Sequence, residues 1–124
     1  MKTAIVFPGQ GSQSVGMMAG FASLPVVKAT FEEASAILGE DYWALAEAGP
    51  AEAQNRTVVT QPLMLIAGVA CWRAWRGQGG AMPAFFAGHS LGEYTALIAA
   101  GAIDFAEALP LVRLRAGAVQ DAVP

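Results

Sequence analysis

Charged side chains are scarce in this sequence of 124 residues, with 7 Lys and Arg against 10 Asp and Glu. They make up 14% of the chain, whereas a typical domain carries about 25%. The net charge of −3 argues against a protein that binds duplex nucleic acid, which needs a basic face for the phosphates. Hydrophobic residues make up 55% of the chain, which excludes disorder. The length allows one domain or part of one.

Cysteine and histidine each occur once. A single cysteine, Cys71, excludes an intrachain disulfide framework. Its apolar neighbours predict a small core residue rather than a reactive thiol. A single histidine, His89, severely limits metal sites and acid–base chemistry.

Long hydrophobic runs are also missing. The longest, Pro62–Trp72, ends at Arg73 and is shorter than the roughly 18–20 residues that a membrane-spanning helix needs. The apolar stretch after Lys2 is too short for a signal peptide, since Pro8 interrupts it. We therefore expect a soluble, cytoplasmic protein with no membrane partner, in which Pro62–Trp72 is buried in the fold.

Two short apolar runs, Ala4–Phe7 and Ala84–Ala87, are typical of strands buried on both faces of a parallel sheet. Their alternation with helical patterns predicts an α/β fold with a parallel sheet. The predicted helices span residues 14–21, 25–38, 42–48, 60–76, 91–100 and a last segment that begins after Asp104.

Several residues predict where helices begin. Thr60 is a candidate N-cap, with Pro62 in the first turn, where a missing N–H does little harm. Asp104 and Glu107 form a capping-box pattern for the last helix. Pro110 lies inside that helix, and we expect it to kink the helix or to shift its start.

The sequence Gly88-His89-Ser90-Leu91-Gly92 matches G-x-S-x-G between a predicted strand and a predicted helix. This context is the one that a nucleophile elbow requires. The flanking glycines lack Cβ atoms that would clash in the sharp turn, and the Leu91 amide at the helix N-terminus can donate to an oxyanion. The bare pattern is also typical of a glycine-rich turn.

His89 is a poor candidate for the base that activates Ser90, because two adjacent residues on a sharp turn point in different directions. We expect a structural histidine under the loop or a residue that lines the pocket. A serine nucleophile needs a base within hydrogen-bond reach. The base therefore lies outside these 124 residues, or the chain does no such chemistry.

Three separated segments carry distinctive motifs: Phe7–Gln13 reads F-P-G-Q-G-S-Q, Thr60–Pro62 reads T-Q-P, and Gly88–Tyr94 reads G-H-S-L-G-E-Y. Together they resemble the malonyl-CoA:acyl carrier protein transacylase family, and the resemblance covers essentially the whole chain. Arg115 falls where that family has an arginine. Because the three motifs occur in the same order as in the family, a chance resemblance is very improbable.

The resemblance implies a role for each matching residue. Ser90 would be the nucleophile, and the backbone amides of Gln10 and Leu91 would form the oxyanion hole. Arg115 would bind the malonyl carboxylate through its planar fork, although an arginine on a helix is otherwise expected to be merely exposed. Arg113 points to another helix face and serves as its internal control. Further residues implied in the pocket are Gln61 and His89, while Gln13 is expected to be only a loop residue.

The resemblance also implies a reaction and its partners. Malonyl-CoA would acylate Ser90, and the phosphopantetheine thiol of acyl carrier protein would then accept the malonyl group. No metal or redox cofactor would be needed. Docking of an acidic carrier protein would need a local basic patch, because a net charge of −3 gives no long-range attraction. Arg73 and Arg76 are candidates, although they equally suit a helix C-terminus.

The implied fold is a hydrolase-like α/β core, interrupted in the family by a small ferredoxin-like subdomain. Residues 1–124 would be the N-terminal part of the large subdomain, and the family's catalytic histidine would lie downstream. We expect such a fragment to be inactive alone and, with half of its core missing, to self-associate. Two alternatives remain: an esterase fragment of the α/β-hydrolase type, and a non-catalytic interaction or assembly fragment.

Overall fold

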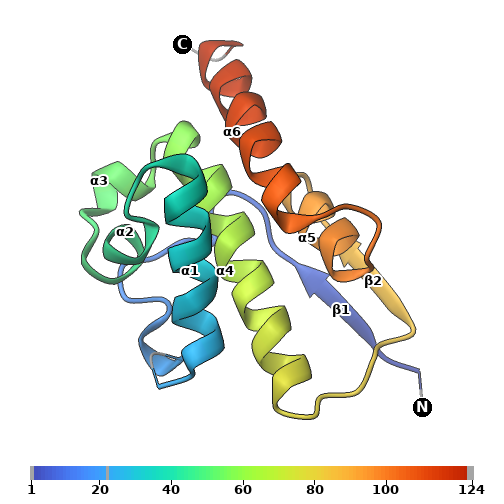
Figure 1. Ribbon diagram of the computed structural model, residues 1–124. Helices are drawn as coiled ribbons and strands as arrows, with labels where there is room; N and C mark the ends of the chain where they lie inside the picture. The colour runs from blue at the N-terminus through green and yellow to red at the C-terminus, as the bar shows by residue number, and fades with distance from the viewer. Residues whose placement is uncertain (1, 22, 123–124) are drawn as a thin grey trace.

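The computed structural model describes residues 2–21 and 23–122 and has an α/β architecture (Figure 1). Strands β1 and β2 lie side by side, and most of the chain between and after them is helical. The strands are β1 (Ala4–Phe7) and β2 (Phe85–Gly88), and the helices are η1 (Ala19–Phe21), α1 (Pro25–Leu38), α2 (Tyr42–Ala48), α3 (Ala51–Gln54), α4 (Thr57–Gly77), α5 (Leu91–Ala99) and α6 (Phe105–Ala122).

The sheet confirms the expected parallel pairing, with Ala4 opposite Phe85. Helix α4 covers one face, where the Trp72 ring meets Phe86 edge-on at 5.0 Å between centroids. On the other face Val6 is 68% exposed and Phe85 is 60% exposed. The prediction of strands buried on both faces is therefore wrong. Helix α5 also packs against both strands, but Val6 and Phe85 stay exposed in the described residues.

Helix α4 runs through the middle of the molecule and packs against α1, α5 and α6 (Figure 1). Leu63, Leu65 and Ile66 are fully buried, which confirms that the apolar run from Pro62 lies inside the fold. By length and composition alone α4 could cross a membrane, but 67% of its apolar window is buried among the other helices. It is therefore the core helix of this structure.

The start of α4 differs from the prediction. The helix begins at Thr57 rather than at a Thr60 N-cap, and Pro62 lies inside it. The Thr60 hydroxyl donates back to the carbonyl oxygens of Gln54 and Arg56 instead of capping the helix. Because Pro62 has no N–H, the Val58 carbonyl one turn earlier loses its helical donor.

The N-terminal helices are partly as expected. Helices α1 and α2 begin and end where the sequence predicts, and Gly39 closes α1 in the left-handed conformation at φ 74°. The helix expected over residues 14–21 is wrong, because only the short η1 forms there. Gly16 has φ 79°, which an α-helix does not allow. Its amide instead donates to the Ala46 carbonyl at 2.8 Å.

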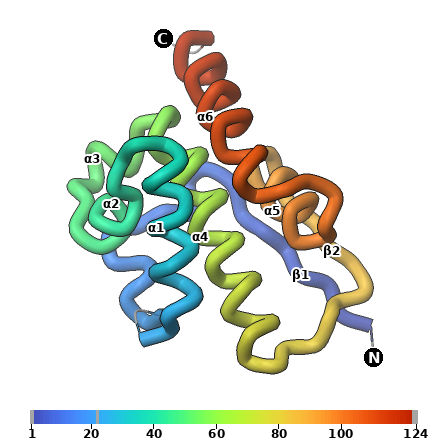
Figure 2. Tube along the Cα trace, viewed as in Figure 1, coloured from blue at the N-terminus to red at the C-terminus, as the bar shows by residue number. Residues whose placement is uncertain are grey.

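Helices α5 and α6 agree with the sequence. Helix α5 ends at Ala99, just before Gly101, which has φ 81°. Helix α6 begins at Phe105, directly after Asp104, and continues through Pro110. The alternative in which Pro110 shifts the helix start is therefore wrong. The C-terminal part of α6 extends beyond the rest of the molecule (Figure 2).

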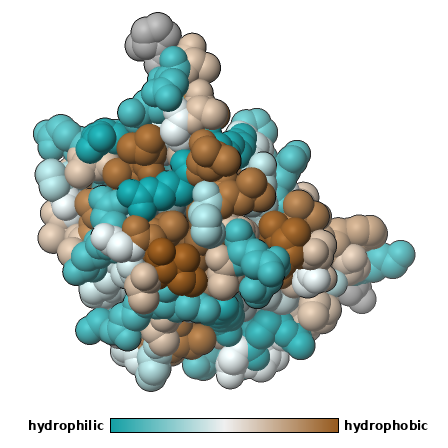
Figure 3. Space-filling model, turned by 45° about the horizontal axis from the view of Figure 1, so that its top comes forward, coloured by the Kyte–Doolittle hydropathy of each residue, from teal (hydrophilic) through white to brown (hydrophobic). Residues whose placement is uncertain are grey.

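Apolar side chains remain on the surface. Hydrophobic patches alternate with hydrophilic ones on the face in Figure 3. Two of the most exposed large apolar residues are Leu114 on α6, at 72%, and Val6 on β1, at 68%. Exposed apolar surface of this kind is typical of an interaction site.

Candidate active site

The centre of the candidate site is the turn from β2 to α5, which carries Ser90. Ser90 has φ 56° and ψ −114°, and it is the sole non-glycine residue with positive φ in the described part of the chain. Such a conformation costs about 1–3 kcal/mol. This geometry agrees with the nucleophile elbow predicted from G-x-S-x-G. It presents an exposed serine at the N-terminus of α5.

Close backbone packing explains the glycines of the elbow. A Cβ atom on Gly88 would lie 2.0 Å from the Gly92 carbonyl oxygen, and one on Gly92 would lie 2.1 Å from the Phe7 carbonyl oxygen. Gly9, in the loop after β1, would meet the His89 carbonyl oxygen at 2.6 Å. The elbow and the loop after β1 are therefore packed directly against each other.

Arg115 reaches Ser90 from helix α6, which lies 25 residues downstream. Its Nη2 donates to Ser90 Oγ at 3.1 Å, and its Nη1 donates to Gln61 Oε1 on α4 at 2.6 Å. The guanidinium carbon also lies 5.5 Å from the centre of the Tyr94 ring on α5. Three helices thus bring a fixed positive charge beside the serine hydroxyl.

Arg113 points away from this cluster, as its helix position predicts. Its Nη1 donates to the Leu38 carbonyl oxygen at 2.6 Å, and its Nη2 lies 3.7 Å from Glu40 Oε2. Arg113 and Arg115 share α6 and differ in their partners. Arg113 is therefore a matched control for any role of Arg115.

The two candidate oxyanion donors come from the ends of β2 and β1. Leu91 is the first residue of α5, so its amide has no helical carbonyl to bind. A Cβ atom built on Gly9 would lie 3.7 Å from the Leu91 nitrogen. The segment that contains Gln10 therefore runs alongside the N-terminus of α5, whose dipole favours negative charge.

His89 is anchored through its backbone. Its amide donates to the Phe7 carbonyl at 3.4 Å, and its carbonyl accepts from the Gly92 amide at 3.0 Å. The residue is exposed, so the expectation of a structural histidine covered by the loop is wrong. A pocket-lining role stays a prediction.

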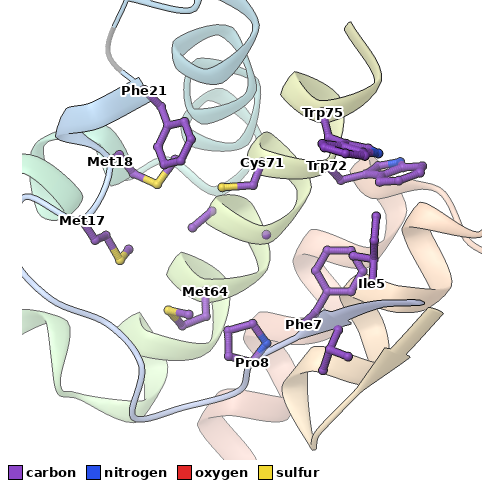
Figure 4. A pocket seen from close by; sticks show the side chains of 13 residues that line it. Ile5, Phe7, Pro8, Met17, Met18, Phe21, Met64, Cys71, Trp72 and Trp75 are labelled. Carbon is purple, nitrogen blue, oxygen red and sulfur yellow. The ribbon is translucent and has the colours of Figure 1, made fainter. Parts of the chain in front are cut away.

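An apolar cavity beside β1 does not include Ser90 in its lining. It has a volume of about 390 Å³ and is bounded by β1, α4 and the segment around Met18 (Figure 4). Cys71 faces this cavity, and burial raises the pKa of its thiol, in keeping with a small apolar residue. Within residues 2–21 and 23–122, His, Cys, Asp and Glu side chains form no group of three that could bind a metal ion.

Arg73 and Arg76, the candidates for a docking patch, have local partners. Arg73 forms an ion pair with Glu33 at 2.9 Å and lies 4.9 Å from the centre of the Phe105 ring. Arg76 donates to the Gly80 carbonyl at 2.9 Å. Their local interactions favour the interpretation as structural charges near a helix end.

Sequence reasoning missed several residues around the site. Tyr94 stacks on Arg115, and its signal was available, because it lies one helical turn after Ser90 on the same face. Asn55 and Gln120 bind residues 42 and 62 positions away, respectively. No local pattern predicts such distant partners.

Comparison with known proteins gives matches over nearly the whole chain. Residues 4–124 match the acyl transferase domain family. The malonyl CoA-acyl carrier protein transacylase of Salmonella typhimurium strain LT2 is 61% identical over 122 residues, which cover 98% of this chain and 40% of that protein. The Escherichia coli K12 protein of the same name is 60% identical over the same shares.

Solved structures give the same picture. The crystal structure of an acyl-carrier-protein S-malonyltransferase from Burkholderia pseudomallei 1710b matches with a TM-score of 0.97 and 62% identity, covering 100% of this chain and 40% of that one. A malonyl-transacylase in complex with a type II PKS acyl-carrier protein matches with a TM-score of 0.96 and 55% identity over the same shares. The chain thus spans about 40% of the length of these relatives.

Proposed function

The chain belongs to the acyl transferase domain family, and from this premise we propose that the protein transfers malonyl groups from coenzyme A to acyl carrier protein in fatty-acid biosynthesis. The relatives named malonyl CoA-acyl carrier protein transacylase support this substrate pair. The observation that carries the proposal is the Arg115 guanidinium, 3.1 Å from Ser90 Oγ. A positive charge beside the nucleophile suits an acyl group that ends in a carboxylate.

In the proposed first half-reaction, Ser90 Oγ attacks the thioester carbonyl of malonyl-CoA. A C–O bond forms, the C–S bond breaks, and coenzyme A leaves as a thiol with the proton from the serine hydroxyl. The positive φ of Ser90 supports this role, because the strained turn exposes the hydroxyl at the start of α5.

The backbone amides of Leu91 and Gln10 are the proposed donors to the oxyanion of the tetrahedral intermediate. Donors of this kind act where negative charge develops, and removing one typically costs 10²- to 10³-fold in kcat. The position of Leu91 as the first residue of α5 supports its part. The loop of Gln10 adjoins the elbow through Gly9.

Arg115 is the proposed anchor of the malonyl carboxylate. Arginine suits this task because its fork binds both carboxylate oxygens and its charge does not titrate. Gln61 accepts from Nη1 at 2.6 Å, which restricts the orientation of the guanidinium. We assign Gln61 and the exposed His89 to the lining of the same pocket.

In the proposed second half-reaction, the phosphopantetheine thiol of acyl carrier protein attacks the ester carbonyl. A C–S bond forms, the C–O bond to Ser90 breaks, and the serine hydroxyl regains a proton. The similar malonyl-transacylase whose structure was solved in complex with an acyl-carrier protein supports this partner. The exchange needs no redox cofactor, because no atom changes its oxidation state, and we propose that it proceeds without a metal. We place the reaction in the cytoplasm.

The base that accepts the serine proton is not assigned within these residues. His89 is the single histidine of the 124 residues, and it is adjacent to Ser90 on the same turn. We therefore propose that the 124-residue chain is inactive alone. It would form the N-terminal part of a large, hydrolase-like α/β subdomain, which a small ferredoxin-like subdomain interrupts.

The experiment that tests this proposal is intact-mass analysis of the protein, expressed from its complete reading frame and mixed with malonyl-CoA. We expect a mass increase of one malonyl group in the wild type and none in Ser90→Ala. Peptide mapping should place the group on Ser90. A wild-type protein without the adduct would refute the proposal.

A further inference from the structure

The loop that follows β1, residues 9–13, contains no regular helix or strand, yet it carries the proposed oxyanion donor Gln10. Its first residue is fixed against the elbow, because Gly9 packs on the His89 carbonyl. Gly11 has φ 109°, so the backbone turns sharply just after Gln10. The orientation of the Gln10 amide therefore depends on what holds the far end of this loop.

Side-chain hydrogen bonds connect the loop to the chain around the start of α4. Gln13 Oε1 accepts from the Gly11 amide at 2.8 Å, and Gln13 Nε2 donates to Asn55 Oδ1 at 2.9 Å. Gln10 Nε2 donates to Thr57 Oγ1 at 3.1 Å. Gln13 thus bridges the loop backbone to a residue 42 positions away, and it uses both ends of its amide.

The same region of α4 supports the other side of the site. Gln61 lies one turn after Thr57 and accepts from Arg115 at 2.6 Å. The Val58 amide donates to Gln120 Oε1 at 3.2 Å, which joins α6 to α4. The oxyanion loop and the arginine therefore share one structural support.

We propose that Gln13 and Asn55 are positioning residues, which hold the loop so that the Gln10 amide faces the carbonyl bound at Ser90. This inference rests on the proposed function. It replaces the expectation that Gln13 is only a loop residue. An oxyanion donor works at about 2.7–3.1 Å from the developing charge, so a loosened loop lowers the rate without removing any group that touches substrate.

The predicted effect differs from that of a merely structural contact. The Gln13 hydrogen bonds lie at the surface, so they contribute little to global stability. Their loss should appear in the acylation rate and not in the melting temperature. It should also affect every acyl-CoA equally, because an oxyanion forms whatever the acyl group is.

The test is the single-turnover rate of Ser90 acylation, measured with malonyl-CoA and with acetyl-CoA on the protein expressed from its complete reading frame. Gln13→Ala and Asn55→Ala should each lower both rates about tenfold, with unchanged thioester affinity. Asn55→Asp keeps the acceptor for Gln13 and should stay close to the wild type. The double alanine variant should be no slower than either single one.

The matched control is Gln78→Ala, which removes an exposed glutamine side chain beyond the end of α4. It should leave both rates unchanged. Unchanged rates in Asn55→Ala, a loss confined to malonyl-CoA, or a fall in melting temperature that accounts for the slower reaction would each overturn the inference.

Amide hydrogen exchange distinguishes this failure from failure of the proposed function. Residues 9–13 should exchange faster in Asn55→Ala than in Asn55→Asp. Faster exchange with normal acylation would overturn the positioning role and leave the proposed function intact. A wild-type protein that forms no acyl-Ser90 would refute the proposed function, and the role of Gln13 with it.

Discussion

Replacing Arg115 with alanine should convert the preference of the site from carboxylated to neutral acyl groups. In the free protein Arg115 Nη2 donates to Ser90 Oγ at 3.1 Å. In the proposed reaction, acylation of the serine would exchange that bond for one to the malonyl carboxylate, and Nη1 has a second N–H free of its bond to Gln61. The variant therefore loses two charge-assisted hydrogen bonds.

The size of the effect follows from these contacts. A hydrogen bond to a charged group contributes about 1.5–3 kcal/mol. Arg115 is only half-buried, so water screens the interaction, and we take about 3–4 kcal/mol for the pair. That free energy corresponds to roughly a 100- to 1,000-fold loss in kcat/KM for malonyl-CoA. The kcat/KM of Arg115→Lys for malonyl-CoA should lie between those of the wild type and Arg115→Ala, because a lysine keeps the charge but lacks the planar fork.

The assay compares kcat/KM for malonyl-CoA and acetyl-CoA in each variant. Acetyl transfer lacks the carboxylate, so Arg115→Ala should change it only about tenfold or less. Arg113→Ala is the control, since that side chain binds Leu38 and Glu40 instead. Equal losses with the two substrates, or an equal effect of Arg113→Ala, would refute the carboxylate-anchor role of Arg115.

Three further predictions concern stability and association. Ser90→Gly should raise the free energy of unfolding by about 1 kcal/mol in urea titrations, because glycine adopts φ 56° without strain; a lower value would contradict the strain. Burial, with the Glu40 carboxylate, raises the pKa of Tyr42 to about 12 from its ordinary value of 10.0. The contribution of neutral Tyr42 to the free energy of unfolding should therefore be fully present below pH 10.0, and about 2–3 kcal/mol should be lost as the pH rises through 12. Tyr42→Phe should abolish this pH dependence. The 124-residue chain alone, with Leu114 72% exposed, should self-associate in light scattering, and a cooperatively melting monomer would contradict this.

The elbow was predictable because its chemistry is local. Two glycines, a serine and the change from strand to helix lie within a few residues, and the backbone of Ser90, with φ 56°, agrees with the sharp turn predicted there. The proximity of Arg115 was predictable only through the family resemblance. Nothing in the sequence around Arg115 indicates Gln61 or Ser90, which lie 54 and 25 residues away, respectively.

The errors arise where tertiary contacts override local preference. Thr60 has the side chain of an N-cap, but it is buried and bonds backward, so α4 starts earlier. Gly16 interrupts an otherwise plausible helix because its amide pairs with Ala46. Val6 is exposed although its strand reads as buried, because apolar sequence does not reveal which faces a helix will cover.

The measurement that most directly tests the central claim is a chase of the acylated protein. The protein is mixed with malonyl-CoA, freed of coenzyme A, and then given acyl carrier protein that bears its phosphopantetheine arm. We predict that the malonyl group leaves the peptide containing Ser90 and appears on the carrier thiol in equal amount. Undiminished transfer by Ser90→Ala, or a malonyl group on Ser90 that the carrier cannot remove, would contradict the account.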